Sequence, residues 1–247
     1  MQNDFFSKQS DFYAQYRPTY PKELFTFILS LIENRSKVWD VATGNGQAAI
    51  SLASYFNEVY ASDLSENQLS HASKLSNIIY HKELAEECSL PDESVDLITV
   101  ATAIHWFNLE SFYKQVERVL KPNGVLIAWS YGGCKINPAV DAVIDPFSFE
   151  FLFDYWAAGA KMNWIDRYAS LTMPFTIQTA PAFAATAQYN MMEVMNYMYS
   201  WSGTQEYIRV HQKNPLLLIK NDLEKAWGNP EERKQINWPL HMKWCRK

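Results

Sequence analysis

The segment Val38–Gln47 constrains the fold of this chain more than any other. It is an apolar run that ends in the acid Asp40, followed by small residues that include Gly44 and Gly46 and then by a helix-compatible run from Gln47 to Phe56. Glycine permits a tight turn with positive φ and the close approach of a ligand. A helix N-terminus offers N–H groups and partial positive charge. The pattern predicts a strand, a loop and a helix that hold a nucleotide-like cofactor.

A second acid stands one helix further on, because residues 59–65 predict a strand with Asp63 at its carboxyl end. In dinucleotide-binding folds an acid at this position accepts hydrogen bonds from ribose hydroxyls, and one carboxylate accepts from two neighbouring hydroxyls. Asp63 also stands where it would cap the helix that begins near Ser65. The two roles are compatible, and the place of Asp63 after the first loop favours ribose.

Three further strands are expected at Ile78–His81, Ser94–Val100 and Val125–Trp129, with helices between them. The apolar residues between Pro21 and Glu33 have helical spacing and predict a helix before the first strand. Alternating strands and helices imply a parallel sheet with right-handed crossovers. The first half of the chain is therefore expected to be an α/β unit.

Four short motifs are present in this half of the chain. The acid Asp40 and the small residues Ala42, Gly44 and Gly46 match D-x-G-x-G-x-G except at Ala42, whose methyl group is expected to crowd the cofactor slightly. The others are S-V-D-L-I-T…H-W-F over 94–107, R-V-L-K-P-x-G over 118–124 and Y-R-P-T-Y-P over 16–21. Together they closely resemble the class I, Rossmann-like S-adenosylmethionine-dependent methyltransferases, in the type 11 small-molecule branch related to trans-aconitate methyltransferase.

The resemblance implies an α/β fold: a seven-stranded, mostly parallel sheet with a closing antiparallel hairpin and a helical lid insertion. It implies S-adenosyl-L-methionine as cofactor. Arg17 is assigned to the methionine carboxylate, with a surface salt bridge as its alternative, and Glu86 to the adenine amine, with a solvated pair beside Glu87 as its alternative. The expected cofactor-binding residues are Arg17, Asp40, Ala42, Gly44, Gly46, Asp63, Leu64, Gln68, Ala85, Glu86 and Ala101.

The second half is expected to complete a single domain, 1–247, made of a cofactor-binding half (1–130), an aromatic helical lid (131–180) and C-terminal hairpin strands and helices (181–247). A strand is expected over 182–189, helices over 191–199 and 214–227, and a last strand over 236–244 with an edge or bulge at Pro239. The aromatic residues of the lid suit either core packing or a pocket. They are Phe147, Phe149, Phe151, Phe153, Tyr155, Trp156 and Trp164.

His105 is the candidate catalytic residue. It follows the fourth strand at the carboxyl edge, where ligands bind in open α/β sheets, and suits a base or a hydrogen-bonding group for the acceptor. A structural histidine beside Trp106 is the alternative. A carboxylate acceptor is already anionic at neutral pH and needs no base. The absence of a compelling acid or base in the sequence therefore favours a carboxylate or a soft nucleophile. We expect a small organic acid methylated on a carboxylate oxygen, with a small phenol, amine or thiol as the alternatives.

Composition narrows the remaining expectations. A net charge of −5 and a pI near 5.6 disfavour nucleic-acid binding. The three cysteines are scattered, which suits a reducing compartment and no metal site. No signal peptide and no membrane span are expected, which predicts a cytoplasmic location. The protein is expected to be a monomer or a homodimer.

Two other function classes remain open at this point. A nicotinamide-dependent oxidoreductase requires G-x-G-x-x-G after the first strand, and residues 42–47 lack that spacing. A non-catalytic S-adenosylmethionine-binding protein is compatible with the departure at Ala42, whereas Asp63 and the H-W-F segment argue against it.

Overall fold

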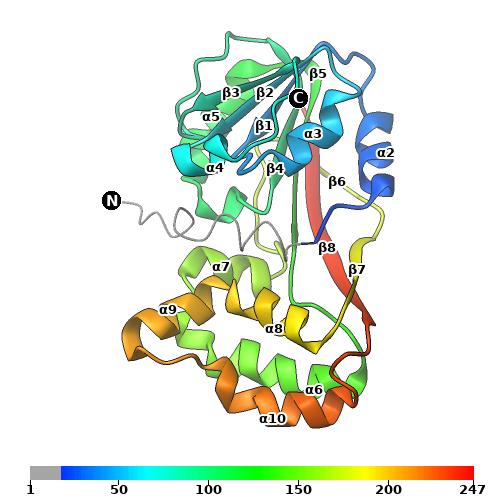
Figure 1. Ribbon diagram of the computed structural model, residues 1–247. Coiled ribbons are helices and arrows are strands. Elements are labelled where there is room, and N and C mark those ends of the chain that lie inside the picture. Colours follow the sequence, from blue (N-terminus) through cyan, green and yellow to red (C-terminus); the bar gives the residue numbers. More distant parts are fainter. Residues whose placement is uncertain (1–17) are drawn as a thin grey trace.

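The computed structural model describes residues 18–247, except for the side chains of residues 163 and 164. A central sheet fills one half of the molecule, and a group of helices from the second half of the chain fills the other (Figure 1). Among the described residues, no helix has the length and apolar character needed to cross a membrane.

Five parallel strands form the main part of the sheet, in the order β3-β2-β1-β4-β5. Three antiparallel strands extend it, because β8 pairs with β5 while β6 and β7 pair with β8. The strands are β1 Lys37–Val41, β2 Glu58–Asp63, β3 Ile78–Lys82, β4 Val95–Ala101, β5 Leu120–Tyr131, β6 Ile177–Gln178, β7 Phe183–Tyr189 and β8 Lys234–Arg246. The expected fold class is confirmed. The described chain has eight strands instead of seven because of the two-residue β6.

Helices cover both faces of this sheet. The apolar residues Leu24 and Ile28 of α2 pack with α3 on one face, and Phe112 and Val116 of α5 pack on the other. The apolar face of α2 explains why the region after Pro21 forms a helix. These helices are α2 Lys22–Ser30, α3 Gln47–Ala53, α4 Glu66–Ser70 and α5 Leu109–Val119, with a single 3₁₀ turn, η1, at Ile104–Trp106.

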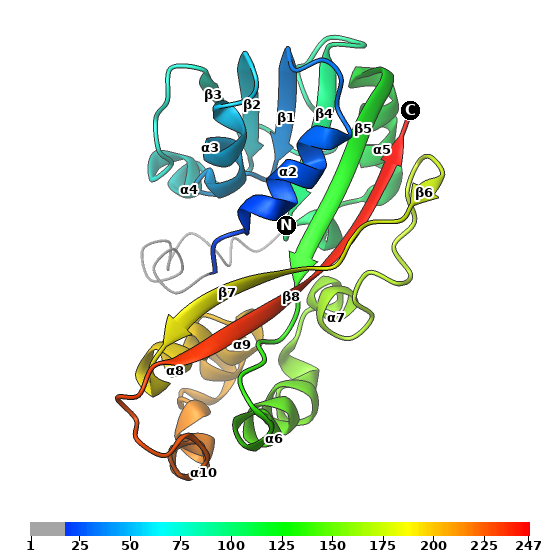
Figure 2. The same cartoon turned by 90° about the vertical axis from the view of Figure 1, so that its right-hand side faces the viewer.

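The second group of helices lies beyond the carboxyl ends of the parallel strands, toward which β5 points (Figure 2). It includes the short turns η2 Phe147–Phe151 and η3 Phe153–Tyr155. Its helices are α6 Pro138–Pro146, α7 Ala158–Trp164, α8 Met191–Tyr199, α9 Ser202–His211 and α10 Leu216–Trp227. Helix α9 was not expected from the sequence.

Strands β7 and β8 connect the two halves (Figure 2). The C-terminal part of β8 pairs with β5, and its N-terminal part pairs with β7. Apolar residues alternate along β8, and of these Ile236, Trp238, Leu240 and Trp244 are buried while Met242 is half-buried. Pro239 is exposed and pairs with β7, and the pairing with β5 begins only at Leu240, which suits a residue without an N–H group.

Candidate functional site

The loop after β1 is held in shape by the side chain of Asp40. This residue is 1% exposed. Its carboxylate accepts hydrogen bonds from the hydroxyls of Thr43 in the loop, at 2.5 Å, and Thr99 in β4, at 2.7 Å. Asp40 therefore ties the loop to two neighbouring strands.

Burial changes the acidity of this carboxyl group. It raises the pKa of Asp40 to about 6, because desolvation outweighs the hydrogen bonds from Thr43, Thr99 and the backbone of Ala49. The negative charge of Asp63 adds to the rise. A nearby positive charge would favour the ionised form of Asp40.

The backbone of the same loop turns through left-handed conformations. Ala42 has φ +51°, Gly44 +58° and Gly46 +86°. Gly46 lies so close to Tyr80 that a Cβ there would stand 2.5 Å from the Tyr80 hydroxyl. Backbone conformation favours glycine at both positions, and close packing against Tyr80 requires it at Gly46. Ala42 adopts a conformation that costs energy for an L-residue.

Asp63 stands at the end of β2 and faces this loop. One carboxylate oxygen accepts the N–H of Gly44 at 2.8 Å, and the other accepts the N–H of Ser65 at 2.8 Å. The cap of α4 is Ser65 itself, whose hydroxyl accepts the N–H of Gln68. Asp63 therefore joins the first loop to the start of α4, and the two acids found from sequence belong to one site.

Two side chains of the β2–α4 region flank Asp63. The amide oxygen of Gln68 is 3.9 Å from the place a Cβ on Gly44 would occupy, and Gln68 is buried. Leu64 is 48% exposed. An apolar side chain and an amide beside the glycine loop are suitable contacts for a flat heterocycle.

The segment after β3 contributes Ala85 and Glu86. Ala85 is buried in the core on the α5 face of the sheet. Glu86 accepts the backbone N–H of Asn108, the N-cap of α5, at 2.7 Å. The carboxylate of Glu86 is thus fixed beside the H-W-F segment and is not merely one of a solvated pair with Glu87.

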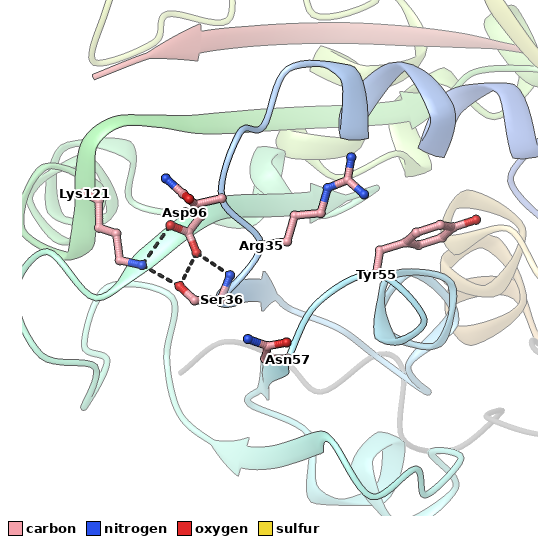
Figure 3. A pocket seen from close by; sticks show the side chains of 7 residues that line it. Arg35, Ser36, Tyr55, Asn57, Asp96 and Lys121 are labelled. Atoms are coloured by element: carbon pink, nitrogen blue, oxygen red, sulfur yellow. Dashed lines mark hydrogen bonds and ion pairs between the residues drawn. The ribbon is translucent and has the colours of Figure 1, made fainter.

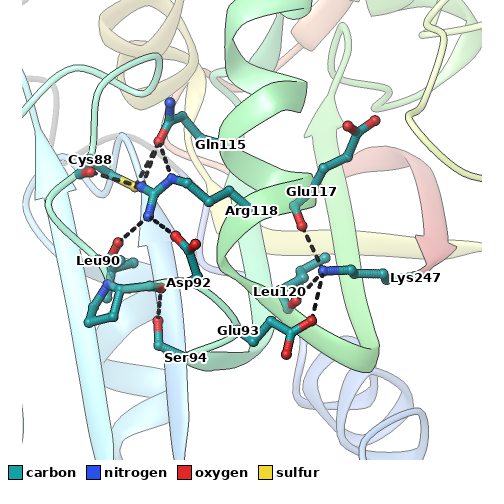
Figure 4. Close-up of polar contacts among 11 residues, drawn as sticks. Cys88, Leu90, Asp92, Glu93, Ser94, Gln115, Glu117, Arg118, Leu120 and Lys247 are labelled. Carbon is teal, nitrogen blue, oxygen red and sulfur yellow. Dashed lines mark hydrogen bonds and ion pairs between the residues drawn. The ribbon is translucent and has the colours of Figure 1, made fainter.

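The arginine of the R-V-L-K-P-x-G motif fixes this segment from the other side (Figure 4). The guanidinium of Arg118 donates to the carbonyl oxygens of Cys88 and Leu90, at 3.0 and 2.5 Å, and to the carboxylate of Asp92, at 3.0 Å. Arg118 therefore secures the loop that carries Ala85 and Glu86 onto α5.

The residues before α2 reach the same edge of the sheet. The Tyr20 hydroxyl lies 3.0 Å from the hydroxyl of Thr102, the residue after Ala101 at the end of β4. The side chain of Gln47 at the start of α3 donates to the carbonyl of Pro18. Arg17, expected on the methionine carboxylate, lies outside the described residues.

His105 lies in η1, just after β4, and is partly buried. Its Nδ1 is 2.8 Å from the hydroxyl of Tyr168, which also has a side-chain hydrogen bond with Ser130. Burial lowers the pKa of His105 to about 3, so the ring is neutral at physiological pH. Sequence reasoning did not single out Tyr168 or Tyr20 as site residues.

Helix α7 packs directly on η1. A Cβ on Gly159 would lie 2.3 Å from the carbonyl oxygen of His105, so this helix approaches only because position 159 is glycine. Of the aromatic residues in the lid, Phe147 and Trp156 are core residues, whereas Phe151 and Phe153 are largely exposed.

A hollow of ≈ 530 Å³ lies at the opposite, amino edge of the sheet, so it is separate from these residues (Figure 3). There Asp96 of β4 accepts hydrogen bonds from Ser36 and from Lys121 of the R-V-L-K-P-x-G motif. Burial opposes ionisation of Asp96, but these bonds keep its pKa below the usual value. The charged residues of the two longest motifs therefore have structural roles.

The described residues contain no group of three or more His, Cys, Asp or Glu side chains arranged to hold a metal ion. The three cysteines Cys88, Cys134 and Cys245 are free thiols.

Comparisons with known proteins agree with this geometry. A family described as a methyltransferase domain matches residues 39–128. A methyltransferase of Dictyostelium discoideum is 36% identical, with 97% of this chain and 94% of that protein aligned. A Saccharomyces cerevisiae protein named as a probable S-adenosylmethionine-dependent methyltransferase is 34% identical, with 97% of this chain and 96% of that protein aligned.

Solved structures extend the likeness to the fold. A structure from Anaeromyxobacter dehalogenans, described as a type II methyltransferase, superimposes with a TM-score of 0.86 at 32% identity over 93% of this chain and 97% of that chain. The Haemonchus contortus phosphoethanolamine N-methyltransferase 2, solved with S-adenosyl-L-methionine, shares the fold at a TM-score of 0.53 and 15% identity, over 97% of this chain and 58% of that chain.

The chain belongs to the class I S-adenosylmethionine-dependent methyltransferases. The expected enzyme class and cofactor are confirmed at this level. This family replaces the two alternatives, a nicotinamide-dependent oxidoreductase and a non-catalytic binding protein.

Proposed function

We propose that this enzyme binds S-adenosyl-L-methionine at the carboxyl ends of β1, β2 and β4 and methylates a small-molecule acceptor on a carboxylate oxygen. The observation that carries the cofactor site is the contact between Asp63 and the N–H of Gly44. It brings the ribose-binding acid and the glycine loop together. A carboxylate accepts up to about four hydrogen bonds, so the bonds from Gly44 and Ser65 are compatible with bonds from ribose hydroxyls.

The neighbouring residues suit the rest of the cofactor. Leu64 and Gln68 flank Asp63 and would contact the adenine ring. Glu86, held beside α5, would accept a hydrogen bond from the exocyclic amine of the adenine. The ionised form of Asp40 would favour the cationic methionine end. The remaining proposed contacts are Arg17 with the methionine carboxylate and the backbone of Ala42, Gly46, Ala85 and Ala101.

The bound cofactor supplies an activated methyl group for in-line displacement. A carboxylate oxygen of the acceptor provides the electron pair of the new C–O bond, the C–S pair stays on sulfur, and no proton is transferred. The protein then has to orient the acceptor and exclude water. The packing of α7 on η1 next to His105 supports the proposal that segment 131–180 acts as a lid.

Calorimetry with S-adenosylmethionine tests the cofactor site. Asp63→Ala should weaken binding by roughly 1–3 kcal/mol, the range for hydrogen bonds to a charged group. Glu66→Ala is the matched control: its carboxylate lies three residues further on, is exposed and pairs with Lys82. Unchanged affinity in a folded Asp63→Ala protein would remove the assignment of Asp63. Binding of NADH instead of S-adenosylmethionine by the wild type would remove the function.

A further inference from the structure

The two ring nitrogens of His105 have different surroundings. Nδ1 lies 2.8 Å from the hydroxyl of Tyr168. Within residues 18–247 no hydrogen-bond partner is found for Nε2, and this atom is not among the fully enclosed polar atoms. One nitrogen is therefore fixed inside the protein, and the other is left for a group that enters the site.

Tyr168 is held firmly. It has no exposed surface, and its backbone has φ +61° after Arg167 at φ +53°. Two consecutive non-glycine residues in the left-handed region persist only where the surrounding structure imposes them. Its hydroxyl also contacts Ser130, which is buried at the end of β5. The phenol thus links the end of β5 to the histidine after β4.

The position of the proton follows from these contacts. Burial raises the pKa of Tyr168 above its ordinary value, so the phenol keeps its proton. Its two neighbours are the Ser130 hydroxyl and Nδ1 of His105, and the imidazole nitrogen is the stronger acceptor. When Tyr168 donates to Nδ1, neutral His105 carries its own proton on Nε2.

We propose that Tyr168 is a positioning residue that keeps His105 in the Nε2-protonated tautomer, so that His105 donates a hydrogen bond to an anionic oxygen of the acceptor and removes no proton from it. This inference rests on the proposed function and deepens it, because it selects acceptors that are already anionic. Among the described side chains, the rings of Trp106 and Tyr168 pack on His105, and of these two Tyr168 titrates. Within residues 18–247, burial is the cause that shifts the pKa of His105, and it keeps the imidazole neutral across the physiological range.

The tautomer can be observed directly by ¹⁵N NMR of histidine-labelled protein, which needs no acceptor. The wild type should show a neutral His105 with protonated Nε2, unchanged between pH 5 and pH 8. Tyr168→Phe should convert this signal to a mixture of tautomers. Tyr113→Phe is the control, since it removes a half-buried phenol hydroxyl that contacts the carbonyl of Thr172 instead. A wild-type His105 protonated on Nδ1, or one that titrates near pH 6.5, would overturn the proposal.

The activity of His105 variants distinguishes a hydrogen-bond donor from a general base. His105→Gln keeps an N–H near the position of Nε2, and His105→Leu has no polar group. With an acid acceptor, the Gln variant should stay within about tenfold of wild-type kcat/KM, while the Leu variant should lose about a hundredfold or more. Equal losses in both variants would contradict the donor role. Cofactor affinity measured on the same proteins keeps the outcomes distinct, because a wild type that does not bind S-adenosylmethionine refutes the proposed function instead.

Discussion

Asp40 holds the loop after β1 in shape, and its burial makes the free energy of unfolding depend on pH. Its pKa is raised from 3.8 to about 6, so the native state retains a proton that the unfolded chain releases. The stabilising contribution is complete below pH 3.8 and is lost as pH rises through about 6. One pKa unit corresponds to ~1.4 kcal/mol, so ionised Asp40 costs on the order of 3 kcal/mol at neutral pH.

Urea unfolding of wild type and Asp40→Asn at pH 4 and pH 8 measures this cost. Relative to Asp40→Asn, wild type should lose stability between the two values, by up to about 3 kcal/mol. Asp96→Asn is the opposite control, because the lowered pKa of Asp96 makes its contribution present at high pH and lost as pH falls. The same pH dependence in both variant comparisons would argue against the buried-acid explanation.

Ala42 stands where the motif D-x-G-x-G-x-G has glycine, and its backbone conformation is unfavourable for alanine. Its φ of +51° is unfavourable for alanine by roughly 1–2 kcal/mol. Ala42→Gly should raise the free energy of unfolding by about 0.5–1 kcal/mol after the entropy of glycine is included, and should tighten cofactor binding slightly. Ala48→Gly in α3 is the control and should lower stability by about 1 kcal/mol. A less stable Ala42→Gly protein would contradict the strain.

Among single residues, the sequence predicted the candidate site residues that belong to short motifs. Asp40, Gly44, Gly46 and Asp63 meet in the structure because consecutive β–loop–α units place their acids at one edge. Tyr168 was missed because it lies 63 residues from His105, and Tyr20 because it lies 82 residues from Thr102. No local pattern links residues so far apart in the chain.

Elements with strong periodicity were predictable, and elements made by tertiary contacts were not. The helix over 191–199 and the strand over 236–244 follow their apolar patterns. Helix α9 was missed because Gly203 disfavours a helix, yet this glycine is needed: a Cβ there would stand 2.9 Å from the Trp156 ring. Strand β6 has two residues and forms only because β8 offers a pairing edge.

Strand β8 is the element on which the sheet depends most. It covers the edge of β5 from Val125 to Tyr131 and supports β6 and β7. A chain truncated before Asn237 should therefore unfold or aggregate, because it exposes an unpaired apolar edge. Pro239→Ala, on the exposed side of β8, is the control and should remain soluble with native circular dichroism. Native thermal stability in the truncated protein would contradict an integral strand.

At the scale of the whole molecule, the parallel sheet and the second group of helices face each other across the carboxyl edge. The sequence predicted this edge as the cofactor site, since open α/β sheets bind ligands there. It did not predict how the acceptor is enclosed, because that depends on close approaches such as Gly159 to the His105 carbonyl. The hollow at the amino edge surrounds the ion pair of Lys121 with Asp96 and lies apart from the proposed cofactor site.

The proposed carboxylate acceptor is testable on the intact enzyme. His105 is neutral and bonded to a phenol, so the described residues at this edge offer a hydrogen-bond donor more readily than a base. We expect transfer of labelled methyl groups to small carboxylic acids in preference to phenols, amines and thiols, as base-labile esters. At saturating S-adenosylmethionine the rate should be flat between pH 7 and pH 8.5, where Asp40 is already ionised. A carboxylate acceptor is fully ionised in this range, whereas an amine or phenol must first lose a proton. The variant His105→Leu should reduce methyl transfer to acids while its affinity for the cofactor is retained. Label found only in base-stable products, with a rate that rises with pH, would reject the carboxylate and leave methyl transfer intact.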